Sequence, residues 1–187
     1  MIMKRVKLTG SKSGFAPALI RVLSDNGYRA RGYGVGEIDL EQPADVARIV
    51  SDADVFVNNA NHGFSQAEIL FELFKLWKDD PAKHIINISS RAAQPNISKG
   101  YLYAAQKAAL EHLANNLTYN SLKKCKISTV AIGLMREQGH YAVPYTDVAK
   151  SICQVIESKY EIPFLAIQHG APYPEVQAWK ALRSADL

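Results

Sequence analysis

Short apolar runs alternate along this chain with amphipathic stretches, and this alternation is the feature that most constrains its fold. The apolar runs resemble strands buried on both faces; they lie at residues 5–10, 53–59, 84–90, 126–132 and 163–169, with a weaker, glycine-containing run at 28–35. Helical patterns fall between or after them, at 15–28, 43–51, 65–78, 100–120, 146–159 and 174–184. This order predicts βαβ units and an α/β, doubly wound, mostly parallel sheet of about six or seven strands with helices on both faces.

One junction leaves no room for a crossover helix, because "YRARGYG" is followed at once by "GEIDL". Parallel neighbours need about a dozen or more connecting residues. Either "EIDL" is a short edge segment, or this side of the sheet is abbreviated. Since no repeat, low-complexity tract or linker interrupts the chain, we expect a single domain over residues 1–187.

Charge and composition exclude several classes of function. The net charge is +4, but the basic residues are scattered and not interleaved with aromatics, so a solvated surface is expected and nucleic-acid binding is not. No apolar run approaches the roughly 18–20 residues that span a bilayer, and "MIMKRVKLTG" lacks the pattern of a secretory signal. Cys125 and Cys153 have no metal-type spacing. We expect a cytoplasmic protein with two reduced thiols, no bound metal and no membrane contact.

A glycine-rich turn, "TGSKSGFA" at residues 9–16, stands between the first strand and the first helix. This arrangement turns backbone N–H groups and a helix N-terminus toward a pyrophosphate. Gly10 would permit the tight turn, Gly14 would let the ligand approach the backbone, and Ala16 would still allow close packing of helix on strand. The turn therefore predicts a dinucleotide site.

The type of dinucleotide is less constrained. An acidic residue at the end of the second strand would accept a hydrogen bond from the ribose 2′-hydroxyl, and "RARGYGVG" offers none. Lys12, Arg29 and Arg31 could instead meet a 2′-phosphate, or could simply be solvated. On this basis we favour NADP(H) over NAD(H).

Five motifs occur in one order along the chain: "TGSKSGF", "IDL", "DVFVNNAN", "INISS" and "YAAQK". In this order, and on these elements, they resemble the short-chain dehydrogenase/reductase family. The counterparts there are a TGxxxGxG loop, a D-[VL] pair, an NNAG strand end, a strand ending in the catalytic serine, and YxxxK. The resemblance runs from about Val6 to Lys159. Ser90 precedes Tyr103 by 13 residues, the usual spacing, so Ser90 rather than Ser89 takes the serine role.

The resemblance implies a Rossmann-type fold and an NAD(P)(H)-dependent oxidoreductase that reduces a carbonyl or oxidises an alcohol. Tyr103 would be the catalytic acid, Lys107, one helical turn on, would favour the phenolate and bind the nicotinamide ribose, and Ser90 would hydrogen-bond the carbonyl oxygen. The residues expected to bind the cofactor are Gly10, Ser11, Lys12, Ser13, Gly14, Phe15, Arg31, Asp39, Leu40, Asn58, Asn59, Ala60, Tyr103, Lys107 and Gly133.

The chain also departs from the family pattern. It is shorter than usual, and its helix at 65–78 contains no Asn, the family's fourth catalytic residue, which helps hold a water chain to the lysine. Ser65 and Gln66 are polar but lie near the start of that helix, so the proton relay is unassigned. Asn61 stands where NNAG has glycine.

The substrate lobe is reduced as well. Ile132 replaces the proline of the family's Pro-Gly, and only "REQGHYAVPY", between Met135 and the next helix, is expected to cover the substrate. Within it His140, Tyr141 and Tyr145 are either substrate contacts or parts of a surface turn. So short a lid excludes little water.

Three hypotheses follow. The first is the reductase, acting on a small-molecule substrate; the second is a nucleotide-binding sensor that retains the fold; the third, an epimerase or dehydratase, fits less well because those chains are longer. The helix at 65–78 is apolar on more than one face. We therefore expect a homodimer or homotetramer through helices 65–78 and 100–120, the alternative being a helix buried more deeply.

Overall fold

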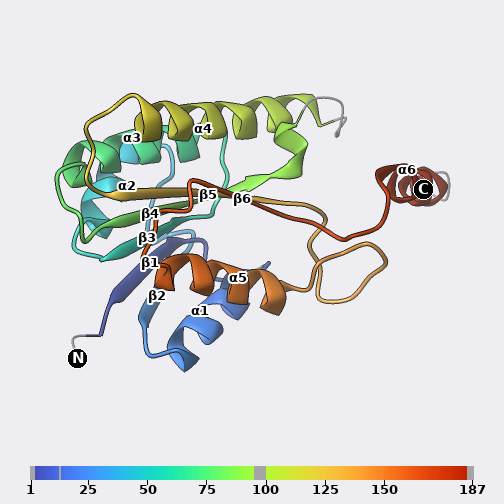
Figure 1. The fold of residues 1–187 in the computed structure, drawn as a ribbon, viewed down its shortest axis with the longest axis horizontal. Helices are drawn as coiled ribbons and strands as arrows, with labels where there is room; N and C mark the ends of the chain where they lie inside the picture. The colour runs from blue at the N-terminus through green and yellow to red at the C-terminus, as the bar shows by residue number, and fades with distance from the viewer. Residues whose placement is uncertain (1–2, 13, 95–99, 185–187) are drawn as a thin grey trace.

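A single parallel sheet organises the molecule. The computed structural model describes residues 3–12, 14–94 and 100–184. Every neighbouring pair of strands in the sheet is parallel. The spatial order is β2 (Arg29–Tyr33), β1 (Arg5–Thr9), β3 (Val55–Asn58), β4 (His84–Ser90), β5 (Lys126–Ile132) and β6 (Phe164–Ile167) (Figure 1). The predicted α/β, doubly wound sheet is confirmed, with six strands among the described residues.

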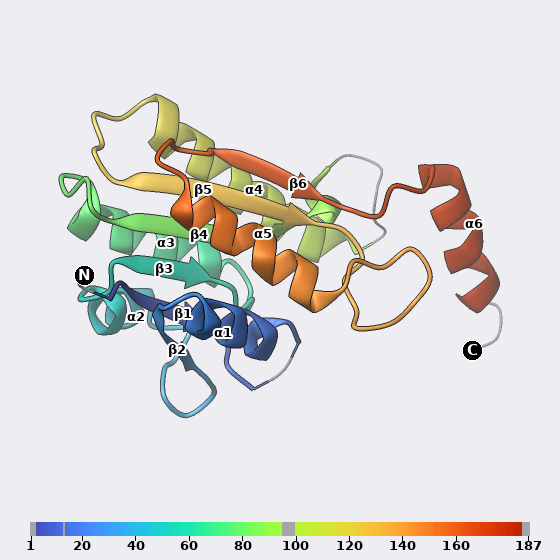
Figure 2. The same cartoon turned by 60° about the horizontal axis from the view of Figure 1, so that its bottom comes forward.

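Helices cover both faces of this sheet, as the alternation predicts. Figures 1 and 2 show α1 (Ala16–Asp25) and α5 (Tyr145–Glu157) side by side on one face. The other face carries α2 (Pro43–Val50), α3 (Ser65–Trp77) and α4 (Tyr101–Tyr119). The last helix, α6 (Tyr173–Ser184), lies beyond the carboxyl ends of β5 and β6 (Figure 2).

Side-chain alternation along the strands divides the core into two apolar layers. Val6, Leu8, Ile86 and Val130 belong to the layer packed against α1 and α5, whereas Phe56, Ile85 and Ile127 belong to the layer packed against α3 and α4. Successive residues of a strand face opposite sides, so a run apolar at every position fits a strand covered on both faces. This is the physical reason why the apolar runs could be read as strands.

The sheet ends at β2, which settles the junction after that strand. Residues 34–42 form turns with one isolated bridge, between Val35 and Ile38, and no helix. Doubly wound sheets commonly carry one more strand outside this one. The second alternative is therefore correct: this side of the sheet is abbreviated.

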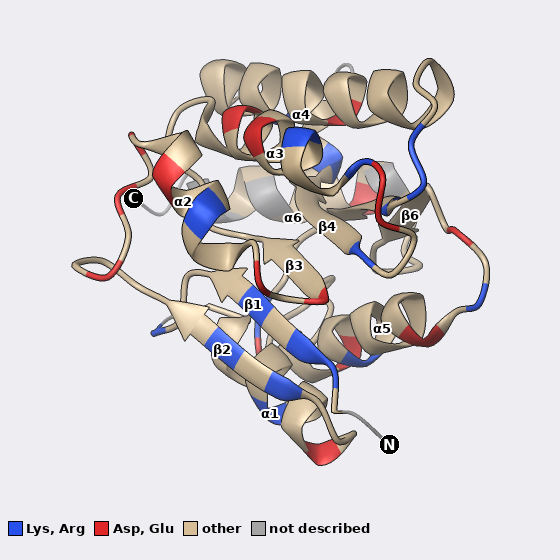
Figure 3. Ribbon diagram, turned by 90° about the vertical axis from the view of Figure 1, so that its left-hand side faces the viewer, with Lys and Arg blue, Asp and Glu red and all other residues tan. Residues whose placement is uncertain are grey.

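Basic residues lie along β2 and β1, the two outermost strands on this side (Figure 3). The register places Arg5 beside Arg29 and Lys7 beside Arg31. Asp52 pairs with both Arg5 and Lys7. Cations on an edge strand discourage further strands from pairing there, which accounts for this cluster without a nucleic-acid ligand.

Other expectations concern thiols, metals and membranes. Cys125 and Cys153 are buried free thiols, and burial raises the pKa of each to about 11. Within the described ranges, no group of three or more His, Cys, Asp or Glu residues is placed to hold a metal ion. A search of the same residues finds no helix with the length and apolarity that crossing a membrane requires.

Candidate functional site

The glycine turn lies at the carboxyl end of β1 and is held there by backbone contacts. The Gly10 N–H donates to the Tyr33 carbonyl at 2.7 Å. Gly10 and Gly14 both have positive φ, +82° and +65°, the region that glycine adopts without strain. A Cβ on Gly10 would come within 2.8 Å of Asn59 Nδ2, whereas a Cβ on Gly14 would meet no atom within 4 Å. The backbone at Gly14 is therefore open to a ligand. Ser13 lies outside the described residues.

A glycine in β2 explains how the turn packs against the sheet. A Cβ on Gly32 would lie 2.7 Å from Ser11 Cβ and 3.0 Å from the Gly10 carbonyl oxygen. Gly32 is thus required by the close approach of the glycine turn. Gly32 weakens the strand prediction in the sequence, and the structure gives the packing reason for a glycine at this position.

A hydrogen-bonded clamp joins the carboxyl ends of β1 and β3. Thr9 Oγ1 accepts from the N–H groups of Asn59 and Ala60, both at 2.9 Å, and Asn59 Nδ2 donates to the Thr9 carbonyl at 2.9 Å. Asn58 points inward: it is fully buried, and its Nδ2 donates to the Gln66 carbonyl at 2.7 Å and to Asn87 Oδ1 at 3.1 Å. Its side chain therefore links the end of β3 to α3 and β4 in the interior.

An acidic residue does reach the end of β2, although the sequence placed none there. Glu37 Oε2 accepts from the Gly34 N–H at 2.9 Å, and Glu37 Oε1 lies 3.6 Å from Arg31 Nη2. The Gly34 N–H, followed by the charges of Arg31 and Lys12, lowers the pKa of Glu37. The Arg31 guanidinium also lies 4.6 Å from the centre of the Tyr33 ring. Arg31 is consequently engaged by two neighbours.

The "IDL" residues have local contacts nearby. Asp39 Oδ1 accepts from the Glu41 N–H at 2.9 Å. Leu40 packs, partly buried, against the apolar layer under α3 and α4. Both lie on the turns that follow β2.

The Tyr/Lys pair lies on α4, with the two side chains in different environments. Tyr103 is 41% exposed, whereas Lys107 is 3% exposed. Lys107 Nζ lies 5.5 Å from the centre of the Tyr103 ring. Nζ donates to the Ile88 carbonyl at 2.9 Å and to Gln66 Oε1 at 2.5 Å. Burial lowers the pKa of Lys107 to about 8, partly offset by the charge of Glu111.

Gln66 is the functional neighbour that the sequence reading left unassigned. Its Nε2 donates to the carbonyls of Asn58, at 2.7 Å, and Ile88, at 3.1 Å, while its Oε1 accepts from Lys107. A position at the start of α3 does not remove it from the lysine, because the first turn of α3 stands beside the ends of β3 and β4. The family's Asn has no counterpart on α3, but a side-chain amide does contact the lysine.

Ser90 is the last residue of β4, two positions beyond Ile88. Its Oγ accepts from the Ala92 N–H at 3.1 Å and caps the short 3-10 helix η1 (Arg91–Ala93), against which α4 packs. Ser90 thus ends the strand whose Ile88 carbonyl accepts from Lys107, so both residues lie at the carboxyl edge of the sheet, with Tyr103 beside the lysine. This is the edge where open α/β sheets bind ligands.

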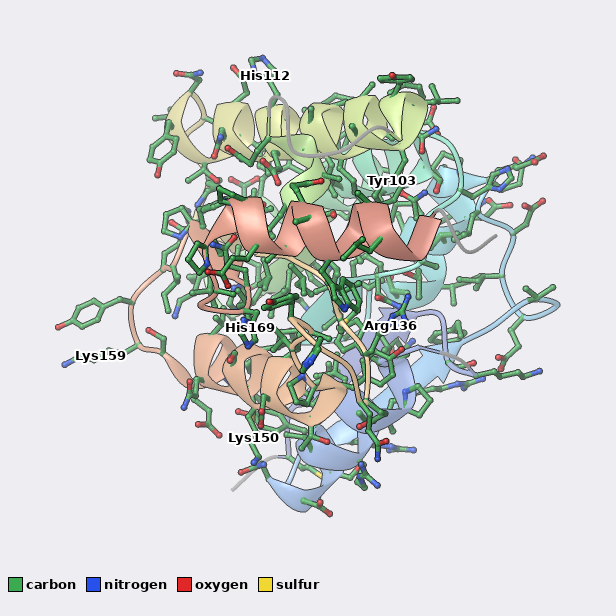
Figure 4. All side chains as sticks on the ribbon, turned by 90° about the vertical axis from the view of Figure 1, so that its right-hand side faces the viewer. Tyr103, His112, Arg136, Lys150, Lys159 and His169 are labelled. Carbon is green, nitrogen blue, oxygen red and sulfur yellow. The ribbon has the colours of Figure 1, made fainter. Side chains whose placement is uncertain are left out.

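The region after β5 contains one more element than the short segment that the sequence predicts. Gly133 allows close approach, since a Cβ there would lie 3.1 Å from Gln168 Cβ. Tyr141, from the short segment after Met135, makes edge contacts with His169 and with Trp179 of α6, at 5.4 and 5.8 Å between ring centres. Figure 4 shows α6 crossing in front of this end of the molecule. The segment at 136–145 thus contacts α6 through Tyr141 and Trp179. His140 is exposed, while Tyr141 and Tyr145 are partly buried.

Known structures supply an independent comparison of the fold. No family model and no curated protein matches the sequence. Among solved structures, serine dehydrogenase from Escherichia coli is 16% identical, with a TM-score of 0.68 over 88% of this chain and 97% of that one. A short-chain dehydrogenase from Streptomyces avermitilis is 17% identical, with a TM-score of 0.71 over 98% and 94%.

A third structure was determined with a cofactor bound. It is the 3-alpha-hydroxysteroid dehydrogenase from Pseudomonas sp. B-0831 complexed with NADH, 19% identical, with a TM-score of 0.68 over 87% of this chain and 94% of that one. At these identities the likeness concerns the fold. This chain has the fold of the short-chain dehydrogenases, and the predicted Rossmann-type architecture is confirmed.

Proposed function

We propose that this chain is a single-domain member of the short-chain dehydrogenase/reductase family, an NAD(P)(H)-dependent oxidoreductase that reduces a carbonyl or oxidises the corresponding alcohol. The observation that carries the proposal is the buried Lys107 beside Tyr103, at the carboxyl edge that also holds Ser90 and the glycine turn. The dehydrogenase fold of the solved structures supports it.

The residues of the glycine turn fit a dinucleotide. Among the described residues no side chain caps the N-terminus of α1, so the first N–H groups of this helix, apart from Pro17, are available to a pyrophosphate. The open space beside Gly14 leaves room for phosphate oxygens. Gly10, Ser11, Lys12 and Gly14 would hold the pyrophosphate side, and Lys107 the nicotinamide ribose.

A bound nicotinamide dinucleotide supplies or accepts the hydride at the substrate carbon. In reduction, Tyr103 donates its phenolic proton to the developing alkoxide oxygen, which leaves an alcohol and a phenolate. Lys107 stabilises that phenolate because its ammonium lies beside the ring. Ser90 donates a hydrogen bond to the same substrate oxygen and steadies the developing charge. Oxidation of the alcohol uses the same groups in reverse.

Binding of the cofactor tests the proposal first. We expect NADPH or NADH to bind the wild-type protein, measured by calorimetry, and Gly14→Trp to abolish that binding by filling the open space while the protein stays folded. A folded wild type that binds neither nucleotide would refute the dehydrogenase reading. A panel of carbonyl substrates should then show turnover that Tyr103→Phe removes; unchanged activity would exclude Tyr103 from the mechanism.

The cofactor preference remains the finer part of the proposal. NADP(H) is favoured by Lys12 and Arg31, but Glu37 engages Arg31 and brings negative charge to the place where a 2′-phosphate would lie. We expect Glu37→Gln to tighten NADPH binding by about tenfold relative to NADH, because a repulsive charge is removed and Arg31 is released. Equal changes for both cofactors would remove Glu37 from the site.

The second candidate is a dinucleotide-binding sensor of the same fold. The small substrate lobe favours this alternative. Among the described residues, the segment at 136–145 and α6 are the elements available to cover a substrate. Bound cofactor without turnover on any carbonyl, together with Tyr103→Phe binding as wild type does, would select this alternative.

Exposed apolar side chains on α3 and α4 support the proposed oligomer. Phe71 and Leu76 of α3 are 46% and 55% exposed, and Leu102 of α4 is 66% exposed. Contiguous apolar surface of this kind marks interfaces between proteins, and a bundle formed by α3 and α4 of two copies would bury these side chains. We expect a dimer or tetramer by analytical ultracentrifugation, and a smaller species for Phe71→Glu. A monomeric wild type would contradict the proposal.

A further inference from the structure

Glu111 continues the functional face of α4 by one further turn. Residues 103, 107 and 111 are spaced by four and therefore share a face of the helix. Glu111 Oε1 accepts a hydrogen bond from Ser89 Oγ at 2.6 Å, and Ser89 is itself buried in β4 next to Ser90. The carboxylate is thus anchored against the strand that carries the candidate serine. The reductase mechanism above does not use it.

Lys107 makes its direct contacts with uncharged groups. Among the described residues its hydrogen-bond acceptors are the Gln66 amide oxygen and the Ile88 carbonyl. Within the described ranges no carboxylate lies at ion-pair distance from its Nζ. A buried ammonium held by neutral acceptors tends to lose its proton, and a neutral lysine would no longer stabilise the phenolate of Tyr103.

We propose that Glu111 is a positioning residue whose anchored carboxylate keeps Lys107 protonated, and so keeps positive charge beside Tyr103. The proposal rests on the proposed reductase function for its catalytic meaning. Its electrostatic part concerns only the charge of Lys107 and can be tested without turnover.

The charged and titratable surroundings agree with this role. Around Lys107 and Glu111 stand Tyr103 on α4, Arg91 on η1, the Gln66 amide on α3 and the Ser89 hydroxyl on β4. Burial lowers the pKa of Lys107 to about 8, and the negative charge of Glu111 raises it. Burial raises the pKa of Glu111, whereas the Ser89 hydrogen bond and the charges of Arg91 and Lys107 lower it. Ser89 and Arg91 therefore help Glu111 remain ionised.

The decisive variant is Glu111→Gln, which removes the charge but retains an acceptor for the Ser89 hydroxyl. Glu68→Gln makes the same change at an exposed position of α3 and serves as the matched control. The primary measurement is the titration midpoint of Lys107, followed by NMR of protein with isotope-labelled lysine. We expect Glu111→Gln to lower the midpoint from about 8 by roughly half a pH unit or more, and Glu68→Gln to leave it in place.

Activity provides the second measurement. In the reductase the alkaline limb of the kcat/KM profile should move to lower pH in Glu111→Gln by the same amount, and Glu111→Asp should restore part of the shift. If Glu111→Gln does not fold, Ser89→Ala replaces it: loss of the anchor should shift the Lys107 midpoint in the same direction but less. An unchanged midpoint in the folded variant, or an equal shift in Glu68→Gln, overturns the role of Glu111. If the Lys107 midpoint shifts in Glu111→Gln but the protein shows no turnover, the role of Glu111 is supported and the proposed reductase function is refuted.

Discussion

The two faces of the sheet carry different buried polar groups. On the face packed against α1 and α5, His84 begins β4 and bonds Ser128 of β5, with 2.8 Å between His84 Nε2 and Ser128 Oγ. On the face packed against α3 and α4, buried polar side chains form a row across three strands. There Asn58, Asn87 and Thr129 stand side by side on neighbouring strands, in register.

The buried polar groups of the two faces also differ in whether they find hydrogen-bond partners. His84 and Ser128 form a hydrogen bond with each other. In the row above α3, by contrast, Asn58 Oδ1, Asn87 Nδ2 and Thr129 Oγ1 are buried without a hydrogen-bond partner among the described residues. Each such group costs about 1–3 kcal/mol. Among the described residues of the sheet, the unsatisfied groups lie on the face where Lys107 and Gln66 make their hydrogen bond, and functional sites commonly carry such a cost.

The largest effect should follow from removing the amide that joins this row to the lysine. Gln66→Leu removes one of the acceptors of the Lys107 ammonium and the amide donor to the Asn58 and Ile88 carbonyls, of which Ile88 keeps Lys107 as a donor. We expect a loss of about 3–5 kcal/mol in the free energy of unfolding, measured with urea. Gln154→Leu, on the exposed side of α5, is the matched control and should change it by less than about 0.5 kcal/mol. Equal losses of unfolding free energy in Gln66→Leu and Gln154→Leu would show that the polar contacts of Gln66 do not stabilise the fold.

A cavity on the opposite face should destabilise the fold without reaching the site. Leu19 on α1 and Leu70 on α3 are both fully buried. We expect either Leu→Ala change to cost about 2–5 kcal/mol in urea unfolding. Only Leu70→Ala, one turn from Gln66, should also move the titration midpoint of Lys107. A shift of that midpoint in Leu19→Ala would show that the two layers are coupled through the sheet.

We expect the buried pair of His84 and Ser128 to make the free energy of unfolding depend on pH in the acid range. Burial, and then the charges of Lys126, Lys4 and Lys123, lowers the pKa of His84 from 6.5 to about 3. Between these values the unfolded chain binds a proton that the folded chain does not, so stability is full above pH 6.5 and falls as the pH is lowered. This histidine contributes a slope of at most about 1.4 kcal/mol per pH unit. His84→Gln should flatten urea-unfolding stability between pH 6.5 and 4; an unchanged slope would assign the sensitivity elsewhere.

Much of this fold was predictable because its signals are local. Apolar runs and helical periodicity placed the helices and strands close to their observed limits, as for α3 (Ser65–Trp77), predicted at 65–78. The glycine turn and the missing crossover were also visible, since both depend on adjacent residues.

What the sequence could not supply depends on distances across the fold. Gln66 and Lys107 are 41 positions apart and meet only because α3 and α4 pack side by side. The Ser89–Glu111 bond needs the register of α4 against β4. Glu37 reaches the end of β2 through a turn whose backbone N–H, at Gly34, orients the carboxylate. In each case the residue types were visible, but the geometry that gives them a role was not.

The smallest effect should come from the hydroxyl at the end of the polar row. Thr129 Oγ1 has no partner among the described residues, so replacing it by a methyl group of similar shape removes a desolvation penalty without removing a bond. We expect Thr129→Val to raise the free energy of unfolding by up to about 1 kcal/mol. Ser128→Ala, next to it but bonded to His84 on the other face, should lower it by about as much, because it leaves the imidazole unpaired. If Thr129→Val instead destabilises the protein, the Thr129 hydroxyl has a hydrogen-bond partner. Only Asn58 and Asn87 would then remain as unsatisfied groups of the polar row among the described residues.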